Sequence, residues 1–271
     1  MSAAEEIKPE KPKTLNRPIR KRVKKFGKMM TRKIAGIQSR SSLVPDTPFI
    51  DNSHFPFLSE LEERWEEVRD EALEVLKHRD AIPGFEQISP DQHRIAKAQK
   101  WKTFILYGFG EQLEKNCETA PRTAEMLSRV PNIQTAWFSI LAPGYHIPAH
   151  TGVTKGIVRA HLGLILPKER EKCRIRVDDQ IKAWNYGEII VLDDTYEHEV
   201  WNETDDERVI LLFDFDRPMG WAGRALNATL LYLMKFTAFY QEPKKNLATF
   251  EERFEAATRR ADENLEKLSE D

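Results

Sequence analysis

The period of the hydrophobic pattern changes along the chain and predicts a β-rich middle between helical ends. From residue 133 to residue 215, short apolar runs are separated by turn-forming segments at Pro143-Gly144, Asn185-Tyr186-Gly187 and 202–206. Runs of this length between Gly, Pro and Asn are typical of strands. Because several strands follow one another without helices between them, we expect an antiparallel sandwich or barrel of the jelly-roll kind.

Apolar residues at helical spacing predict helices outside this region. The helices are expected over residues 58–76, 121–130, 221–240 and 250–268. The first should begin with a capping box of Ser59 and Glu62, and the second with a proline at its first position. The third is strongly apolar but is interrupted by Arg224, Asn227 and Lys235, which favours a buried or interfacial helix over a membrane span.

Charge is distributed unevenly along the chain. Hydrophobic residues make up 40% of the sequence and charged residues 32%, as in an ordinary soluble protein, and the formal net charge is −2. Residues 8–33 nevertheless hold twelve Lys and Arg and one acid, a net charge of +11 that leaves −13 for the rest. Since residues 1–45 contain few large apolar groups, packing cannot offset their loss of entropy, and we expect a basic, mobile arm.

The basic arm has several expected roles. Clusters such as Arg20-Lys21-Arg22 and Lys24-Lys25 attract anionic lipid or nucleic acid, and a plain solvated tail is the alternative. Val23, Phe26 and two methionines interleave with the cations as on an interfacial helix. This pattern favours peripheral contact with an anionic membrane over binding to nucleic acid.

Domain order and compartment follow from the same features. After the arm we expect a β-rich domain with N-terminal helices at residues 46–220 and a helical extension at residues 221–271. The only cysteines are Cys117 and Cys173, which fits a reducing compartment. The N-terminal segment lacks the apolar core of a signal peptide, and no run of eighteen apolar residues occurs. We therefore expect a cytoplasmic protein with peripheral membrane contact.

Two polar residues interrupt one face of an otherwise apolar strand over residues 156–166. Successive side chains of a strand point to opposite faces, so Arg159 and His161 share a face, while Val158, Ala160 and Leu162 share the other. An inward-facing Arg and His pair is costly unless an anion accompanies it, which predicts an anion site. The alternative is the solvated face of an edge strand.

A second polar cluster is predicted on the strands at residues 195–201 and 207–215. His198 and Val200 share a face of the first strand, and Arg208 lies on one face of the second. If the strands form a hairpin through residues 202–206, Arg208 opposes Val200 and lies diagonally beside His198. A register shift of one residue would separate them.

The segment His150-Thr151-Gly152 precedes the strand that carries Arg159. Non-haem iron(II) sites use two His and one carboxylate, with the first His and the carboxylate in a His-x-Asp/Glu unit. Gly152 stands at the carboxylate position here. By spacing alone, His150 is either a metal ligand or a structural histidine.

Taken in order, these motifs resemble the aspartyl/asparaginyl β-hydroxylase family over residues 101–215. The motifs are Phe138-Ser139-Ile140, Pro143-Gly144, His150-Thr151-Gly152, Arg159-Ala160-His161-Leu162-Gly163-Leu164, Asp193-Asp194-Thr195-Tyr196-Glu197-His198-Glu199-Val200-Trp201 and Arg208. The resemblance implies a double-stranded β-helix, cupin-like and mainly β with flanking helices. It also implies a dioxygenase that uses Fe(2+), 2-oxoglutarate and O2 to hydroxylate a carbon and releases succinate and CO2.

The resemblance also implies roles for individual residues. His150 and His198 match the iron ligands, and Arg208, helped by Ser139, matches the group that binds the distal carboxylate of 2-oxoglutarate. Arg159 and His161 match the groups near its other carboxylate. The family's animal aspartyl hydroxylases share the glycine at position 152, so water could complete the metal shell. Asp193 or Asp194 either orients His198 or belongs to a solvated turn.

Several alternatives remain open at this stage. The substrate is a peptide Asp or Asn side chain or a lipid acyl chain, since residues 214–219 also resemble the lipid A hydroxylases of the same superfamily. Those enzymes carry a His-x-Asp unit that this chain lacks. A 2-oxoglutarate-dependent halogenase would use the space that Gly152 leaves beside iron. A non-catalytic binding or sensor module on the same barrel is the third alternative.

Overall fold

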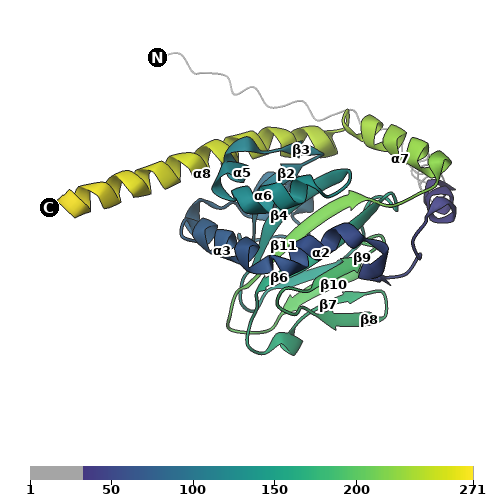
Figure 1. The fold of residues 1–271 in the computed structure, drawn as a ribbon, viewed down its shortest axis with the longest axis horizontal. Coiled ribbons are helices and arrows are strands. Elements are labelled where there is room, and N and C mark those ends of the chain that lie inside the picture. The colour runs from purple at the N-terminus through teal and green to yellow at the C-terminus, as the bar shows by residue number, and fades with distance from the viewer. Residues whose placement is uncertain (1–32, 271) are drawn as a thin grey trace, which may run out of the picture.

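The computed structural model describes residues 33–270, whose strands form two packed antiparallel sheets (Figure 1). In spatial order, the seven-stranded sheet comprises β1 (Phe49–Ile50), β9 (Ile189–Leu192), β6 (Ile157–Ile165), β11 (Arg208–Asp216), β4 (Ile133–Leu141), β2 (Trp101–Gly108) and β3 (Glu111–Gln112). The four-stranded sheet comprises β5 (His146–His150), β10 (His198–Asn202), β7 (Cys173–Val177) and β8 (Gln180–Ala183). From β4 to β11 the chain passes repeatedly between the two sheets. This is the expected double-stranded β-helix, and that prediction is confirmed.

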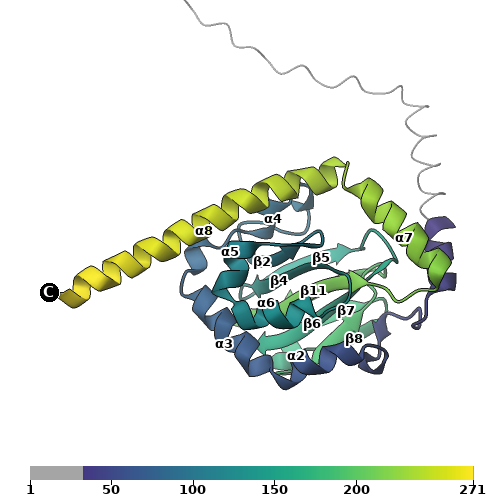
Figure 2. The ribbon, with the colours of Figure 1, turned by 45° about the horizontal axis from the view of Figure 1, so that its top comes forward.

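One hydrophobic layer lies on each side of the seven-stranded sheet. On β11, Val209 and Leu211 belong to the layer beneath the helices, while Ile210 and Leu212 belong to the layer between the sheets. The helices over the outer face are α2 (Ser59–Glu63), α3 (Trp65–Leu76) and α6 (Pro121–Ser128) (Figures 1 and 2). Fully burying one large aliphatic side chain stabilises the fold by about 1.5–3 kcal/mol. Arg208 shares the inward face with Ile210, so the same alternation directs it between the sheets.

The predicted alternation on β6 holds along most of the strand. Val158, Ala160 and Leu162 pack beneath the helices, and Arg159 and His161 face the other way, as predicted. The ladder to β11 then shifts register between Val209 and Ile210. Leu166, which strict alternation from Leu162 would place on the outer face, lies in the inner layer instead. A bulge of this kind reverses the faces of the residues beyond it.

The predicted hairpin between the last two strands is wrong. β10 pairs with β5 and β7 in one sheet, whereas β11 pairs with β4 and β6 in the other. Asn202 directs the crossover, because its side-chain amide donates to the carbonyls of Leu141 (3.3 Å) and Asp206 (2.9 Å). Arg208 therefore lies opposite Leu141 and not opposite a residue of β10.

The N-terminal helices differ from the predicted pattern in two respects. The predicted helix over residues 58–76 is broken at Arg64 into α2 and α3. The predicted capping box is also wrong, since the Ser59 hydroxyl donates to the carbonyl of Pro56 (3.0 Å). Glu62 instead accepts hydrogen bonds from Asn52 (3.2 Å) and from the backbone N–H of Ile189 (2.8 Å). The helix predicted at residues 121–130 is confirmed as α6.

Two helices follow the sheets and curve around one edge of the body. These are α7 (Trp221–Met234) and α8 (Ala238–Glu270), which extends beyond the sheets (Figure 1). Of the expected arm, residues 33–41 form a helix beside the start of α7 and Val44 is buried, while residues 1–32 lie outside the described residues. The remaining elements are α4 (Phe85–Ile88), α5 (Glu114–Thr119) and short 3-10 helices at Asn52–His54, Pro56–Leu58, Arg79–Ala81, Pro90–Gln92 and Arg170–Lys172. No helix between residues 33 and 270 is both long and apolar enough to cross a membrane.

Candidate active site

Two histidines from neighbouring strands meet at one end of the sandwich. His150 ends β5 and His198 begins β10, and the two are direct partners in the antiparallel ladder. Their ring centroids are 4.1 Å apart, with an interplanar angle of 53°. The structure thus brings together the two residues that the sequence suggested as metal ligands.

A backbone contact fixes one nitrogen, Nδ1, of each ring. Nδ1 of His150 is 2.8 Å from the carbonyl oxygen of Pro148, and Nδ1 of His198 is 3.0 Å from that of Tyr196. A carbonyl only accepts, so each Nδ1 carries the hydrogen and each Nε2 keeps its lone pair. Burial, with the neighbouring His150, lowers the pKa of His198 to about 3, and burial also lowers the pKa of His150. Both rings are therefore neutral at physiological pH, and each has an Nε2 lone pair available for a metal ion.

Asp194 supplies a carboxylate at the position where Gly152 leaves space. The residue follows β9, and its carbonyl accepts a hydrogen bond from the N–H of Gly152 (2.6 Å). Its carboxylate occupies the volume that a Cβ on residue 152 would need. Burial raises the pKa of Asp194 to about 6, against the effect of Arg159 at 3.4 Å. Within residues 33–270, no group of three His, Cys, Asp or Glu side chains is placed to hold a metal ion.

Arg208 is the most deeply buried cation beside the histidines. Its side chain is 2% exposed, and its guanidinium lies 4.8 Å above the Trp184 ring. Its contacts with Ser139 are long, at 3.3 Å to the hydroxyl and 3.4 Å to the carbonyl. Burial lowers the pKa of Arg208 to about 10. In the described part of the chain its Nε has no hydrogen-bond partner.

His161 has an equally unsatisfied ring. It is 4% exposed, and neither ring nitrogen has a partner among the described residues. Burial, together with the charges of Arg159 and Arg208, lowers its pKa well below the usual range. Buried polar groups normally have partners, because each unmade hydrogen bond costs about 1–3 kcal/mol. The unpartnered atoms of His161 and Arg208 indicate a polar ligand between the sheets.

Arg159 has a protein partner that sequence reasoning missed. Its Nε and Nη2 donate to the two carboxylate oxygens of Asp214 at 2.8 and 2.9 Å. Asp214 lies directly opposite Arg159 in the ladder between β6 and β11. Strand alternation from Arg208 would have placed Asp214 on the inner face of β11. The sequence did not give the register of β6 and β11, so it could not show that Asp214 pairs with Arg159. Burial alone would lower the pKa of Arg159, but the carboxylates of Asp214 and Asp194 raise it and hold the charge at the cavity wall.

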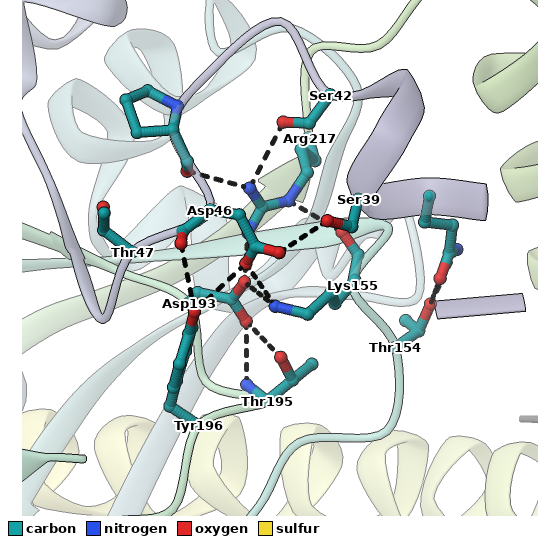
Figure 3. Close-up of polar contacts among 12 residues, drawn as sticks. Ser39, Ser42, Asp46, Thr47, Thr154, Lys155, Asp193, Thr195, Tyr196 and Arg217 are labelled. Carbon is teal, nitrogen blue, oxygen red and sulfur yellow. Dashed lines mark hydrogen bonds and ion pairs between the residues drawn. The ribbon is translucent and has the colours of Figure 1, made fainter. Parts of the chain in front are cut away.

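Asp193, considered from the sequence as a residue that orients His198, has a different set of contacts. It is fully buried and accepts hydrogen bonds from Arg217 and from Lys155 (Figure 3). Lys155 also bonds to Asp46. The cluster ties the loop after β5, the turn before β10 and the N-terminal segment together. It supports the backbone on both sides of the histidine pair, while the Tyr196 carbonyl orients the His198 ring.

A cavity of about 540 Å³ opens beside the histidines. His150, Gly152, Arg159, Asp194 and Asp214 line its polar side. Its apolar walls include Trp101, Ile105, Trp137, Ile157, Leu231 and Met234. The last two belong to α7, and the exposed Arg94 also borders the cavity. The sequence did not indicate that α7 would form a wall of this cavity.

Comparisons with known proteins agree with these features. A family model described as Aspartyl/Asparaginyl beta-hydroxylase matches residues 62–218. An ornithine lipid ester-linked acyl 2-hydroxylase from Rhizobium tropici is 41% identical over 209 residues, which cover 77% of this chain and 74% of that protein. The human aspartyl/asparaginyl beta-hydroxylase is 32% identical over 173 residues, covering 62% of this chain but only 22% of that protein.

Among solved structures, a Burkholderia pseudomallei oxidoreductase of the 2OG-Fe(II) oxygenase family is similar to this chain. It covers 44% of this chain and 67% of its own, with 14% identity and a TM-score of 0.36. A likeness at this level supports no conclusion about activity. The sequence matches carry the relationship.

Proposed function

Because the chain belongs to the aspartyl/asparaginyl β-hydroxylase family, we propose that it is an Fe(II)- and 2-oxoglutarate-dependent dioxygenase that hydroxylates a lipid acyl chain. One observation carries the proposal. The paired, neutral imidazoles of His150 and His198 lie at a cavity that His150 lines, and among the described residues the buried Nε of Arg208 and both ring nitrogens of His161 have no hydrogen-bond partner. This combination is suited to a cation and a polar ligand at adjacent positions.

The donor set fits a metal ion. Each imidazole offers Nε2, and the carbonyls at Nδ1 fix the ring orientation and tautomer, an arrangement common among metal-binding histidines. His150 and His198 would hold the ion and leave it open to 2-oxoglutarate.

The buried cations fit a dicarboxylate cosubstrate. Arg208 and the Ser139 hydroxyl would hold the distal carboxylate of 2-oxoglutarate, which would give the unpaired Nε a partner. His161 lies on the same inner face and would contact the cosubstrate closer to the metal. Arg159 remains tied to Asp214 and would act mainly through its charge.

Iron with 2-oxoglutarate would supply the oxidative chemistry that side chains cannot perform. The chain's own residues have simpler tasks. The histidines hold the ion, Arg208 orients the cosubstrate, and the apolar cavity wall excludes water and positions the carbon to be hydroxylated.

A lipid acyl chain is the favoured substrate over a peptide side chain. The relative covered over most of its length is named as an acyl hydroxylase, and the cavity has apolar walls to which α7 contributes Leu231 and Met234. An alkyl chain gains free energy by leaving water for such a surface. A peptide Asp or Asn remains the alternative substrate.

The position of Asp194 disfavours the halogenase alternative. It requires a halide in the space beside Gly152, but the Asp194 carboxylate lies there. A second anion next to a buried carboxylate is unfavourable. We therefore propose hydroxylation over halogenation.

Succinate formation from 2-oxoglutarate tests the proposed function. The purified full chain, with Fe(II) and air, is expected to form succinate faster when a hydroxylatable acyl lipid is added, with one oxygen atom gained by the lipid. His150→Ala provides the blank. Stimulation by Asp or Asn peptides but not by lipids would move the substrate to polypeptide. Chlorinated product in the presence of chloride would support the halogenase, and no turnover with any substrate would favour a binding module.

A further inference from the structure

The helix α7 and the residue that follows it expose large hydrophobic side chains to solvent. The exposed fractions are 79% for Trp221, 60% for Tyr232, 56% for Leu233 and 70% for Phe236. Ten large hydrophobic side chains are exposed among the described residues, so four of the ten fall within sixteen positions. A concentration of this kind on a soluble surface marks an interaction site.

The patch continues onto the helix at residues 33–41. Gln38 of that helix donates to the Asn227 side chain of α7 (3.2 Å), and the Gly220 N–H donates to the Ser41 carbonyl (2.8 Å). Ile37 and Leu43, at or just after this helix, are 46% and 69% exposed. Figure 2 shows the two helices side by side at one edge of the molecule. We call this combined surface, over residues 33–43 and 221–236, the α7 face.

The charge of the α7 face is positive. No acidic residue occurs between Arg217 and Glu242, while Arg224 and Lys235 are exposed on α7 and directly after it. The helix at residues 33–41 also follows the segment of residues 8–33, whose net charge is +11. A helix with exposed aromatic and aliphatic groups and only positive charges is suited to the interface of an anionic bilayer.

The α7 face is also directly connected to the active-site cavity. Leu231 and Met234 line the cavity on the inner side of α7, while Tyr232 and Leu233 point outward between them. One helix therefore separates solvent from the cavity that contains His150. This continuity distinguishes α7 from other exposed apolar residues, such as Leu73 on α3 and Ile181 on β8.

We propose that the α7 face binds the surface of a bilayer that contains anionic lipid and that an acyl chain enters the cavity along α7. Trp221, Tyr232 and Phe236 lie at the level of the headgroups and upper acyl chains. The basic segment adds attraction to anionic headgroups. The second part of the proposal, the path of the acyl chain, rests on the proposed function.

Vesicle co-sedimentation of the full chain tests the binding. Vesicles of phosphatidylcholine with phosphatidylglycerol are compared with vesicles of phosphatidylcholine alone, at low and high salt. The test variant is Trp221→Ser/Phe236→Ser, because neither side chain lines the cavity. The matched control is Leu73→Ser/Ile181→Ser, which removes two exposed apolar side chains elsewhere. Thermal melts establish that both variants are folded.

The wild type and the control are expected to bind anionic vesicles equally. The test variant should lose at least about tenfold in its bound-to-free ratio, because its anchors in the apolar layer are gone. Equal binding by the test variant would overturn the proposal and assign the attraction to the basic segment alone. Absence of wild-type binding at low salt would also overturn it, as would a dimer that only the test variant fails to form.

A soluble substrate separates this inference from the proposed function. With a short-chain lipid below its aggregation concentration, the test variant should form succinate at the wild-type rate, but with vesicles it should be slower. Loss of vesicle binding without loss of turnover leaves the proposed function intact. Vesicle binding by a protein that forms no succinate with any substrate would overturn the proposed function alone.

Discussion

The carboxylate of Asp194 fills the space in which a side chain on residue 152 would have to begin. The two residues come from different parts of the chain, and the Gly152 N–H donates to the Asp194 carbonyl (2.6 Å). The acid of a His-x-Asp/Glu unit is thus missing at residue 152, and an acid from the turn before β10 takes the space of its Cβ. The glycine is required here by close approach, not by an unusual backbone angle.

We expect Gly152→Ala to destabilise the fold by about 1–3 kcal/mol, because the new Cβ would overlap a short, buried side chain. Urea unfolding measures the change. Gly36→Ala is the control, since a Cβ there meets no atom within 4 Å. In an Asp194→Gly background the same Gly152→Ala change should cost little. An equal loss in both backgrounds would show that Asp194 is not the obstacle.

Metal binding should depend on the histidine pair. Losing a group that merely orients a metal ligand costs about 10–100-fold in affinity, so His150→Ala or His198→Ala should weaken Fe(II) binding by more than about 100-fold. Anaerobic titration calorimetry measures the affinity. His146→Ala is the matched control, because His146 is exposed on the same strand and contacts Glu199 and not the cavity. Similar losses in all three variants would contradict the assignment.

The sequence predicted which faces the polar residues occupy but not which strands are neighbours. The period of two correctly placed Arg159 and His161 on one face, because that rule needs only a local extended chain. The hairpin of β10 and β11 was wrong, because alternation does not distinguish two strands of one sheet from strands on opposite sheets. Of the amide contacts of Asn202, those to the carbonyls of Leu141 and Ala142 are made to residues about sixty positions away.

The site contacts that the sequence did not predict also join residues far apart in the chain. The ion pair between Arg159 and Asp214 spans 55 positions and follows from the observed register of β6 and β11. The part of α7 in the cavity wall depends on where the helix lies after β11. Motif resemblance selected His150, His198 and Arg208, but it contained no information about these tertiary contacts.

Arg208 should control cosubstrate affinity. Arg208→Lys keeps a charge but loses the planar fork, so we expect the KM for 2-oxoglutarate to rise about tenfold or more. Arg208→Met should leave the protein without cosubstrate at least as stable, because it removes a buried cation that lacks a carboxylate partner. The rise in Tm on adding 2-oxoglutarate should be smaller in Arg208→Lys and lost in Arg208→Met. Arg174→Lys, at a more exposed position above Trp201, is the control.

Among the polar groups near the site, the cluster around Asp193 should stabilise the fold most. Asp193→Asn removes the charge that compensates Arg217, which is 2% exposed, and should cost about 3–5 kcal/mol. Glu111→Gln, in an exposed pair with Lys244, should cost at most about 1 kcal/mol. Thermal or urea unfolding measures both. A small effect at Asp193 would mean that water replaces the lost partner.

Asp216 should produce a measurable pH dependence of stability. Burial raises its pKa to about 6 from an ordinary value of 3.8, although a hydrogen bond from Gln134 (2.9 Å) opposes the shift. The folded state therefore binds this proton more tightly than the unfolded state, so the contribution is favourable at low pH and is lost as the pH rises through about 6. Asp216→Asn removes the titration and keeps an oxygen to accept from Gln134. The variant's Tm should exceed that of the wild type at pH 8, and the difference should shrink towards pH 4. A difference that stays constant between these pH values would show that the carboxyl group of Asp216 is not the cause.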